Sequence, residues 1–289
     1  MLFNSGTIPI KIKLVRVLDL KKHERIIQPK LQELKLYLRN QTILKNPIII
    51  DKNLIILDGN HRANAFAQLG FKYICACQIN YFNKHVKLGY WDRRFSNISN
   101  IKHIKSYLKA KNYTLTTFST WKKLLDYQKT HLLGFGLHYR EQNYFVSFKN
   151  ELVNGAVTAN NQLEKFQEFL QDSPEFVPDK YLKQAEFTET LTKSDLIIIA
   201  PRIIKKMVVE ASNNQLVFAP KSTRHIIPSR PLNLDIPIQL LNSQINLSKA
   251  QSQLKDYLKK KDIIRFGPGQ VIEGRYYEEE ILVFLDKNR

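Results

Sequence analysis

One segment, IILDGNHRANAFAQLG at residues 55–70, constrains this chain more than any other. An aliphatic run leads into DGNHR at 58–62, and a short helical pattern then ends at Gly70, which suits the position after a helix C-terminus. The order predicts a strand, a tight turn and a helix. Four of the five turn residues are polar, although a tight turn by itself needs neither a histidine nor an arginine.

The residue types in this turn predict a phosphate site. We expect Asn60 to be the N-cap, with His61 and Arg62 in the first helical turn. That turn has unpaired N–H groups and the positive end of the helix dipole, so cations are unfavourable there without an anion. A phosphate would satisfy both, and Gly59 would let it approach the backbone. Asp58 adds a carboxylate that could accept a proton or hold a metal-bound water. An Asp-Gly turn capped by asparagine is the purely structural alternative.

Length and hydropathy narrow the class of protein. The chain has 289 residues and is 43% hydrophobic, which suits one large domain or two smaller ones. No apolar run approaches the ~20 residues of a membrane helix. The first thirteen residues do not resemble a signal peptide, so we expect a cytoplasmic protein that does not bind membranes.

The net charge of +19 predicts an anionic partner. Nucleic acid is possible but not favoured, because the lysines are dispersed and abundant Lys, Ile and Asn also result from a coding bias toward A and T. A phosphorylated small molecule fits the charge equally well. We interpret Cys75 and Cys77 as packed apolar residues, because a structural zinc site needs four ligands.

Hydrophobic periodicity divides the chain into two expected domains. Residues 1–91 have short alternating and aliphatic runs and two helical patterns, one starting near Pro29 and the short one after the 58–62 turn, which predicts a compact α/β domain. Residues 92–289 should form a larger, partly helical domain, with a helical insertion at about 95–190 and an extended, rigid, proline-rich loop at 219–232. Its expected elements are helices at 101–111, 119–132, 161–171 and 194–212, a strand at 143–148, and a helix from a capping box at Ser248 and Gln251 to about 260.

The segment at 55–70 resembles the strand–turn–helix of the ParB/sulfiredoxin-like superfamily, which binds nucleotide phosphates there. Sulfiredoxins have a cysteine in this turn, whereas this chain has Asn60. A narrower resemblance, to free L-serine kinases including the siderophore-precursor type, covers residues 10–91 and 215–285. It depends on four motifs in order: HE at 23–24, DGNHR at 58–62, Trp91, and KSTRH at 221–225.

The resemblance implies a mixed-sheet, nucleotide-binding N-terminal domain in an α/β (α+β) fold. It also implies a kinase that uses ATP or ADP, with Mg²⁺, to convert free L-serine into O-phospho-L-serine, a precursor for siderophores or cysteine. Glu24 would take the proton of the serine hydroxyl, and Asp58 would be the second candidate or would orient the magnesium ion. The amino acid would be held by Thr223, His225 and Trp91. The nucleotide phosphates would contact Gly59, Asn60, His61, Arg62, Ser222 and Arg224.

Two other functions compete with this interpretation. A nucleotide-responsive, ParB-like DNA-binding regulator is favoured by the net charge, and a nuclease is an activity often assigned to this superfamily. The KSTRH loop distinguishes the kinase, because a regulator does not need it. If the chain is a kinase, we expect the 221–225 loop and the 58–62 turn to face one cleft.

Overall fold

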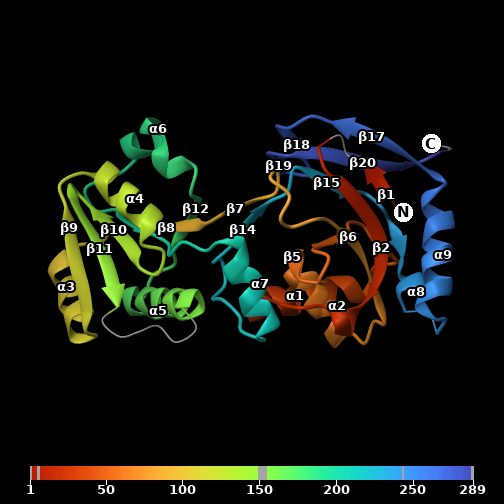
Figure 1. The fold of residues 1–289 in the computed structure, drawn as a ribbon, viewed down its shortest axis with the longest axis horizontal. Coiled ribbons are helices and arrows are strands. Elements are labelled where there is room, and N and C mark those ends of the chain that lie inside the picture. Colours follow the sequence, from red (N-terminus) through yellow and green to blue (C-terminus); the bar gives the residue numbers. More distant parts are fainter. Residues whose placement is uncertain (1, 5–6, 149–154, 243, 288–289) are drawn as a thin grey trace. The chain divides into compact units, whose positions relative to one another are not determined.

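The computed structural model describes residues 2–4, 7–148, 155–242 and 244–287 (Figure 1). The chain forms two compact units, one made of residues 1–87 and 225–289 and the other of residues 88–224. The second unit is therefore an insertion in the first, which differs from the expected boundary after residue 91. The C-terminal segment belongs to the first unit because its elements pair with early ones, as β16 (Ile236–Pro237) does with β3 (Ile43–Leu44).

The main sheet of the first unit is mixed, as predicted. β4 runs parallel to β6, and the other neighbouring strands are antiparallel. Cys75 and Cys77 lie on β6 as fully buried free thiols, which confirms that they are core residues. The strand order is β1 (Leu2–Asn4), β2 (Pro9–Arg16), β6 (Tyr73–Gln78), β4 (Ile48–Ile50) and β5 (Ile56–Asp58).

Helix α2 (Asn60–Gln68) follows β5 and ends just before the predicted glycine, with Leu69 as its C-cap. Gly70 has a φ of +77°, the left-handed conformation common just after a helix. Its N–H donates to the carbonyl of Ala67 at 3.2 Å, and the N–H of Phe71 donates to that of Phe66 at 3.0 Å. The rings of Phe66 and Phe71 pack with their centroids 4.5 Å apart, so local chemistry determines where α2 stops.

The C-terminal part of the first unit adds a three-stranded sheet and further short elements. The predicted rigid loop at 219–232 contains two strands, and the closing segment forms a hairpin and two strands. Helix α9 begins two residues earlier than expected, because Asn246 and not Ser248 caps it by accepting from the N–H of Lys249 at 2.9 Å. The C-terminal elements are β15 (Ser229–Leu232), α8 (Ile238–Leu241), α9 (Leu247–Leu258), β17 (Lys261–Phe266), β18 (Gln270–Ile272), β19 (Arg275–Tyr277) and β20 (Glu280–Asp286). β14 (Arg224–Ile226) begins at the last residue of the second unit, and η1 (Val17–Asp19) and α1 (Gln28–Arg39) lie in the N-terminal part of the first unit.

The second unit is built on a six-stranded sheet, so the expectation of a mostly helical insertion is wrong. All of its neighbouring strands are antiparallel. The predicted helix at 194–212 is a strand followed by a helix. The sheet order is β12 (Glu175–Pro178), β8 (Trp91–Phe95), β13 (Leu196–Ile199), β10 (Phe135–Tyr139), β11 (Gln142–Phe148) and β9 (Tyr113–Phe118). The other elements are β7 (Lys87–Gly89), α3 (Ile101–Ala110), α4 (Trp121–Thr130), α5 (Gly155–Leu170), η2 (Tyr181–Lys183), α6 (Ala185–Glu189) and α7 (Lys205–Asn213).

Strand β13 shows why the sequence was misleading. Its four residues are all buried, because helices cover both faces of this sheet. Ile198 packs with residues of α3 and α5, whereas Ile197 and Ile199 pack with residues of α4. A strand buried on both faces has no polar alternation, so periodicity does not distinguish it from a buried helix. Among the described helices, none is both long and apolar enough to cross a lipid bilayer.

Candidate active site

The turn between β5 and α2 depends on a glycine. Gly59 is the N-cap of α2 and has a φ of +91°, so the predicted cap, Asn60, is instead the first helical residue. A Cβ atom on Gly59 would lie 2.6 Å from Cγ2 of Ile48, so close packing also excludes a side chain. No described side chain caps the helix by a hydrogen bond, so a capping side chain would not compete with an anion at the positive end of its dipole.

Two hydrogen bonds attach the loop that carries Glu24 to the start of α2. The side-chain amide of Asn60 donates to the backbone carbonyl of Glu24 at 2.6 Å. The N–H of Ile27 donates to Nε2 of His61 at 3.1 Å. This contact needs Nε2 unprotonated, so His61 is neutral here and does not supply the positive charge expected of it. The structure thus brings Glu24 and the turn together across 36 residues of sequence.

Asp58 lies between two arginines. Nη1 of Arg230 is hydrogen-bonded to Oδ2 of Asp58, and Nη2 of Arg62 lies 3.8 Å from the same oxygen. Nη1 of Arg62 also donates to the carbonyl of Asn46 at 2.6 Å. Burial would raise the pKa of Asp58, but the charges of Arg230 and Arg62 outweigh it and hold that pKa well below its usual range. Asp58 is therefore a permanently ionised acceptor and a weak base.

Arg230 and Glu279 are site residues that the sequence analysis missed. Arg230 is 7% exposed, and its Nε donates to Oε1 of Glu279 at 2.6 Å. The parallel pairing of β15 with β20, in which Arg230 is opposite Ile281, brings the two side chains together. The available signals were the arginine in the proline-rich stretch IIPSRP and the acidic run at 278–280, but nothing local connects them.

His225 lies beside the Glu24 loop. Its Nε2 is 2.9 Å from the hydroxyl oxygen of Tyr81, and its ring meets that of His23 edge-on with centroids 5.1 Å apart. His23 is buried, and this burial lowers its pKa to about 4, so its imidazole is neutral at physiological pH. His225 thus belongs to a packed aromatic group next to the predicted base.

The second unit holds the other predicted residues around Trp91. Nζ of Lys221 lies 4.8 Å from the centroid of the Trp91 ring, and the guanidinium carbon of Arg224 lies 5.7 Å from it. Ser222 differs from the expectation that it contacts phosphate. It is fully buried, and its hydroxyl donates to the carbonyl of Ala219 at 2.7 Å, so it closes its own loop.

The predicted site residues therefore divide between the two units. Glu24, the 58–62 turn and His225 belong to the first unit, whereas Trp91 and residues 222–224 belong to the second. Thr223 is 8% exposed. The expectation that all of them serve one cleft stays a prediction.

Among the described residues, no three His, Cys, Asp or Glu side chains are grouped as a metal site would need. Asp58, which was expected to orient magnesium, does not fit that role, because Arg62 and Arg230 surround it with positive charge.

Comparisons with known proteins agree with the predicted resemblance. No family model matches the chain. It is 25% identical over 245 residues to the ATP-dependent L-serine kinase of Staphylothermus marinus, covering 81% of this chain and 94% of that protein. It is 21% identical to the ADP-dependent L-serine kinase SerK of Thermococcus kodakarensis, covering 77% of this chain and 89% of that one. A free serine kinase with one glutamate replaced by alanine, solved with AMP, has a TM-score of 0.64 at 18% identity over 80% of this chain and 94% of that one. The predicted resemblance to free serine kinases and the predicted fold class are confirmed.

Proposed function

We propose that the protein is a nucleotide-dependent kinase that transfers a phosphoryl group from ATP or ADP to free L-serine. The proposal is supported by two L-serine kinases that match most of the chain and by the shared fold. One observation carries it: Asn60 and His61, at the start of α2, hold the loop of Glu24 by two hydrogen bonds. A candidate phosphate site and a candidate base are thereby attached to each other.

The start of α2 is the proposed binding site for the donor phosphates. No side chain in the described part of the chain caps its first turn, and the helix dipole there favours an anion. Gly59 lets a phosphate reach the backbone N–H groups, and Arg62 adds positive charge in the first turn. Arg224, beside Trp91, is the proposed contact of the transferred phosphoryl group.

Glu24 is the proposed general base. The serine hydroxyl oxygen attacks the terminal phosphorus of the nucleotide, a new O–P bond forms, and the bond to the leaving nucleotide oxygen breaks. Glu24 accepts the hydroxyl proton, and the nucleotide leaves one phosphate shorter. Asp58 is unsuited to this step, because its arginine partners keep its pKa low. Thr223, His225 and Trp91 are the proposed contacts of the amino acid.

We assign the magnesium ion to the phosphate oxygens and water, which is how Mg²⁺ is commonly held beside nucleotides. When bound, it would neutralise part of the phosphate charge. We place the reaction in the cytoplasm. The product, O-phospho-L-serine, would serve as a precursor for siderophore or cysteine synthesis.

Phosphorus NMR tests the proposed reaction. The protein is mixed with L-serine, Mg²⁺ and either ATP or ADP. We expect a phosphoserine resonance to grow as one of the two donors is consumed, and the shortened nucleotide identifies the donor. Absence of phosphoserine with both nucleotides, from folded protein that binds nucleotide, would contradict the proposal.

The second candidate is a nucleotide-responsive, ParB-like regulator that binds DNA. The net charge of +19 favours it. It is less well supported, because L-serine kinases match this chain over most of its length. A labelled DNA duplex that bound with nucleotide-dependent affinity, from protein without kinase activity, would favour the regulator.

A further inference from the structure

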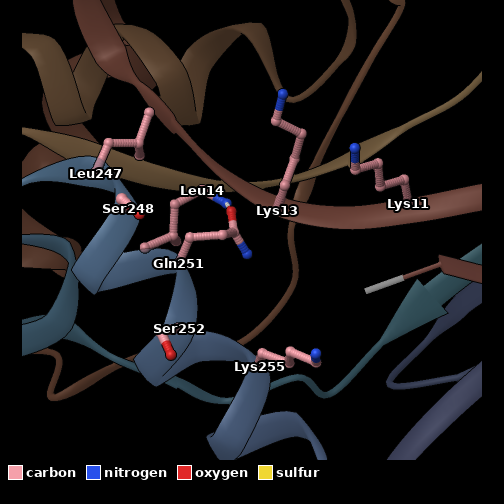
Figure 2. A pocket seen from close by; sticks show the side chains of 8 residues that line it. All are labelled: Lys11, Lys13, Leu14, Leu247, Ser248, Gln251, Ser252 and Lys255. Atoms are coloured by element: carbon pink, nitrogen blue, oxygen red, sulfur yellow. Dashed lines mark hydrogen bonds between the residues drawn. The ribbon is translucent and has the colours of Figure 1, made fainter.

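A basic groove lies between β2 and α9 in the first unit, apart from the residues of the candidate active site (Figure 2). Its volume is about 630 Å³. Pockets for small ligands commonly measure ~300–1,000 Å³, so a metabolite would fit. The lining residues are Lys11, Lys13, Leu14, Leu247, Ser248, Gln251, Ser252 and Lys255.

Local structure explains why these side chains meet. The alternation of β2 buries Ile10 and Ile12 and leaves Lys11 and Lys13 on the other face of the sheet. The lining residues of α9 are three, four and seven positions after Ser248, so they share one side of the helix. The groove is therefore a consequence of two regular elements packed side by side.

Gln251 joins the two elements and leaves a donor for a ligand. The register of β1 with β2 ends at Lys11, and the N–H of Leu14 beyond it donates to Oε1 of Gln251 at 2.8 Å. With its oxygen accepting from Leu14, Gln251 still has a side-chain NH₂ that can donate to a ligand. Figure 2 shows this nitrogen turned away from Leu14.

The lining is rich in donors and positive charge. It presents three ammonium groups, two serine hydroxyls and the Gln251 amide, and none of the described lining residues is acidic. Among the described residues, no carboxylate forms an ion pair with Lys11, Lys13 or Lys255. Partial burial and the charge of Lys11 lower the pKa of Lys13.

We propose that this groove binds a small phosphorylated anion, a phosphate monoester or a diphosphate. Phosphate oxygens accept hydrogen bonds, which matches a lining made of donors. A nucleic acid requires a longer basic stripe that follows its backbone, whereas here the cations surround a concave space of metabolite size. The proposal does not depend on the kinase activity.

Calorimetric titration with inorganic pyrophosphate tests the site on the full chain. The test variant is Lys13→Gln with Lys255→Gln. The matched control is Lys249→Gln with Lys259→Gln, which removes two charges from exposed lysines of the same segment that do not line the groove. We expect the test variant to lose one class of pyrophosphate site, with affinity at least about tenfold weaker, because two charged hydrogen-bond donors are removed.

Three further measurements make the test decisive. Circular dichroism should show the same fold in both variants, and Lys13→Arg with Lys255→Arg should restore pyrophosphate binding. Binding of a random-sequence DNA duplex should be equal in the test and control variants. The proposal is overturned if pyrophosphate binds the test and control variants equally, or if the test variant weakens duplex binding alone.

Discussion

Two carboxylates near the start of α2 have different surroundings and therefore different chemistry. Oδ2 of Asp58 accepts a hydrogen bond from Arg230 and lies 3.8 Å from Nη2 of Arg62. These positive charges stabilise the ionised carboxylate and lower the pKa of Asp58. Glu24 is half-buried, and its backbone carbonyl accepts the hydrogen bond that attaches its loop to α2. The carboxylate takes no part in this hydrogen bond, so the conformation of the loop determines where it lies. This contrast favours Glu24 as the base and gives Asp58 a structural role.

Replacement of Glu24 by glutamine keeps the shape of the side chain and removes its basicity. We expect Glu24→Gln to lower turnover of L-serine about 10²–10⁴-fold, the usual cost of a lost general base. Nucleotide affinity should change little, because the backbone carbonyl of Glu24 still accepts from Asn60. Steady-state kinetics and nucleotide titration measure the two effects, and near-normal turnover would contradict the assignment.

Arg230 should contribute strongly to stability, because its removal leaves Asp58 and Glu279 without their shared partner. We expect Arg230→Met to lower the free energy of unfolding by about 3 kcal/mol, as for other broken buried pairs. The control is Arg265→Met, since Arg265 is half-exposed and 3.8 Å from Glu280, and it should cost less than about 1 kcal/mol. Urea denaturation measures the free energy of unfolding of both variants. Equal losses would show that the ion pairs of Arg230 with Asp58 and Glu279 contribute little to stability.

Asp92 should make stability depend on pH. Burial raises its pKa to about 6, although Arg202 and the N–H of Ala200 oppose the shift. The folded protein therefore binds this proton more tightly than the unfolded chain does. The stabilisation is complete below pH ~4 and is lost as the pH rises through ~6, with a loss on the order of 3 kcal/mol.

The variant Asp92→Asn removes this titration and keeps an acceptor for Ala200. We expect its free energy of unfolding, relative to wild type, to increase between pH 4.5 and pH 7.5. His23, whose low pKa destabilises the fold as the pH falls, is present in both proteins and cancels in this difference. Urea denaturation at the two pH values gives the result, and a difference independent of pH would refute the role of Asp92.

At the scale of elements, the junction of β5 and α2 uses two glycines for different reasons. Gly59 and Gly70 both have positive φ, but a Cβ atom would meet Ile48 at 2.6 Å in the first case and no atom within 4 Å in the second. The first glycine thus combines backbone conformation with close packing, whereas the second needs the conformation alone.

Alanine substitutions separate the cost of the left-handed backbone from the cost of overpacking. We expect Gly70→Ala to lower the free energy of unfolding by about 1 kcal/mol, the cost of left-handed backbone for a residue with a Cβ atom. Gly59→Ala should cost about 2–4 kcal/mol, because overpacking against Ile48 adds to that cost. Thermal or urea unfolding compares them, and equal losses would mean that the β4 side chain moves aside freely.

At the scale of the whole molecule, the chain passes between the two units twice. The second passage lies between Arg224 and His225, inside the motif KSTRH. This motif therefore contributes residues to both units. The proposed contact of this motif with substrate therefore involves residues of both units.

His225 tests whether this motif recognises the amino acid. We expect His225→Ala to raise the KM for L-serine about tenfold or more, the usual effect of a lost charged or polar contact, with the KM for nucleotide unchanged. The control is Tyr81→Phe, which removes the hydroxyl that contacts Nε2 of His225 and keeps the histidine itself. A change in the KM for nucleotide alone would show that His225 belongs to the donor site.

Local sequence was sufficient to predict the secondary structure of the segment at 55–70. The strand, the turn and the helix that ends at Gly70 were predicted, because backbone preferences and contacts a few residues apart decide them. The same local reasoning placed the cap at Asn60 in error, because Gly59 is the cap and adopts a left-handed conformation beside Ile48 of β4. The fold class also followed from the sequence, through a resemblance carried by four short motifs.

Only the tertiary structure decided which distant residues meet. Arg230 reaches Asp58 across 172 residues, and the parallel pairing of β15 with β20 supplies Glu279 as its second partner. The same long-range pairing returns residues 225–289 to the first unit and leaves 88–224 as an inserted sheet. A sequence pattern reports the preferences of neighbouring residues, whereas strand partners and buried ion pairs depend on how the chain closes its long loops around a shared core.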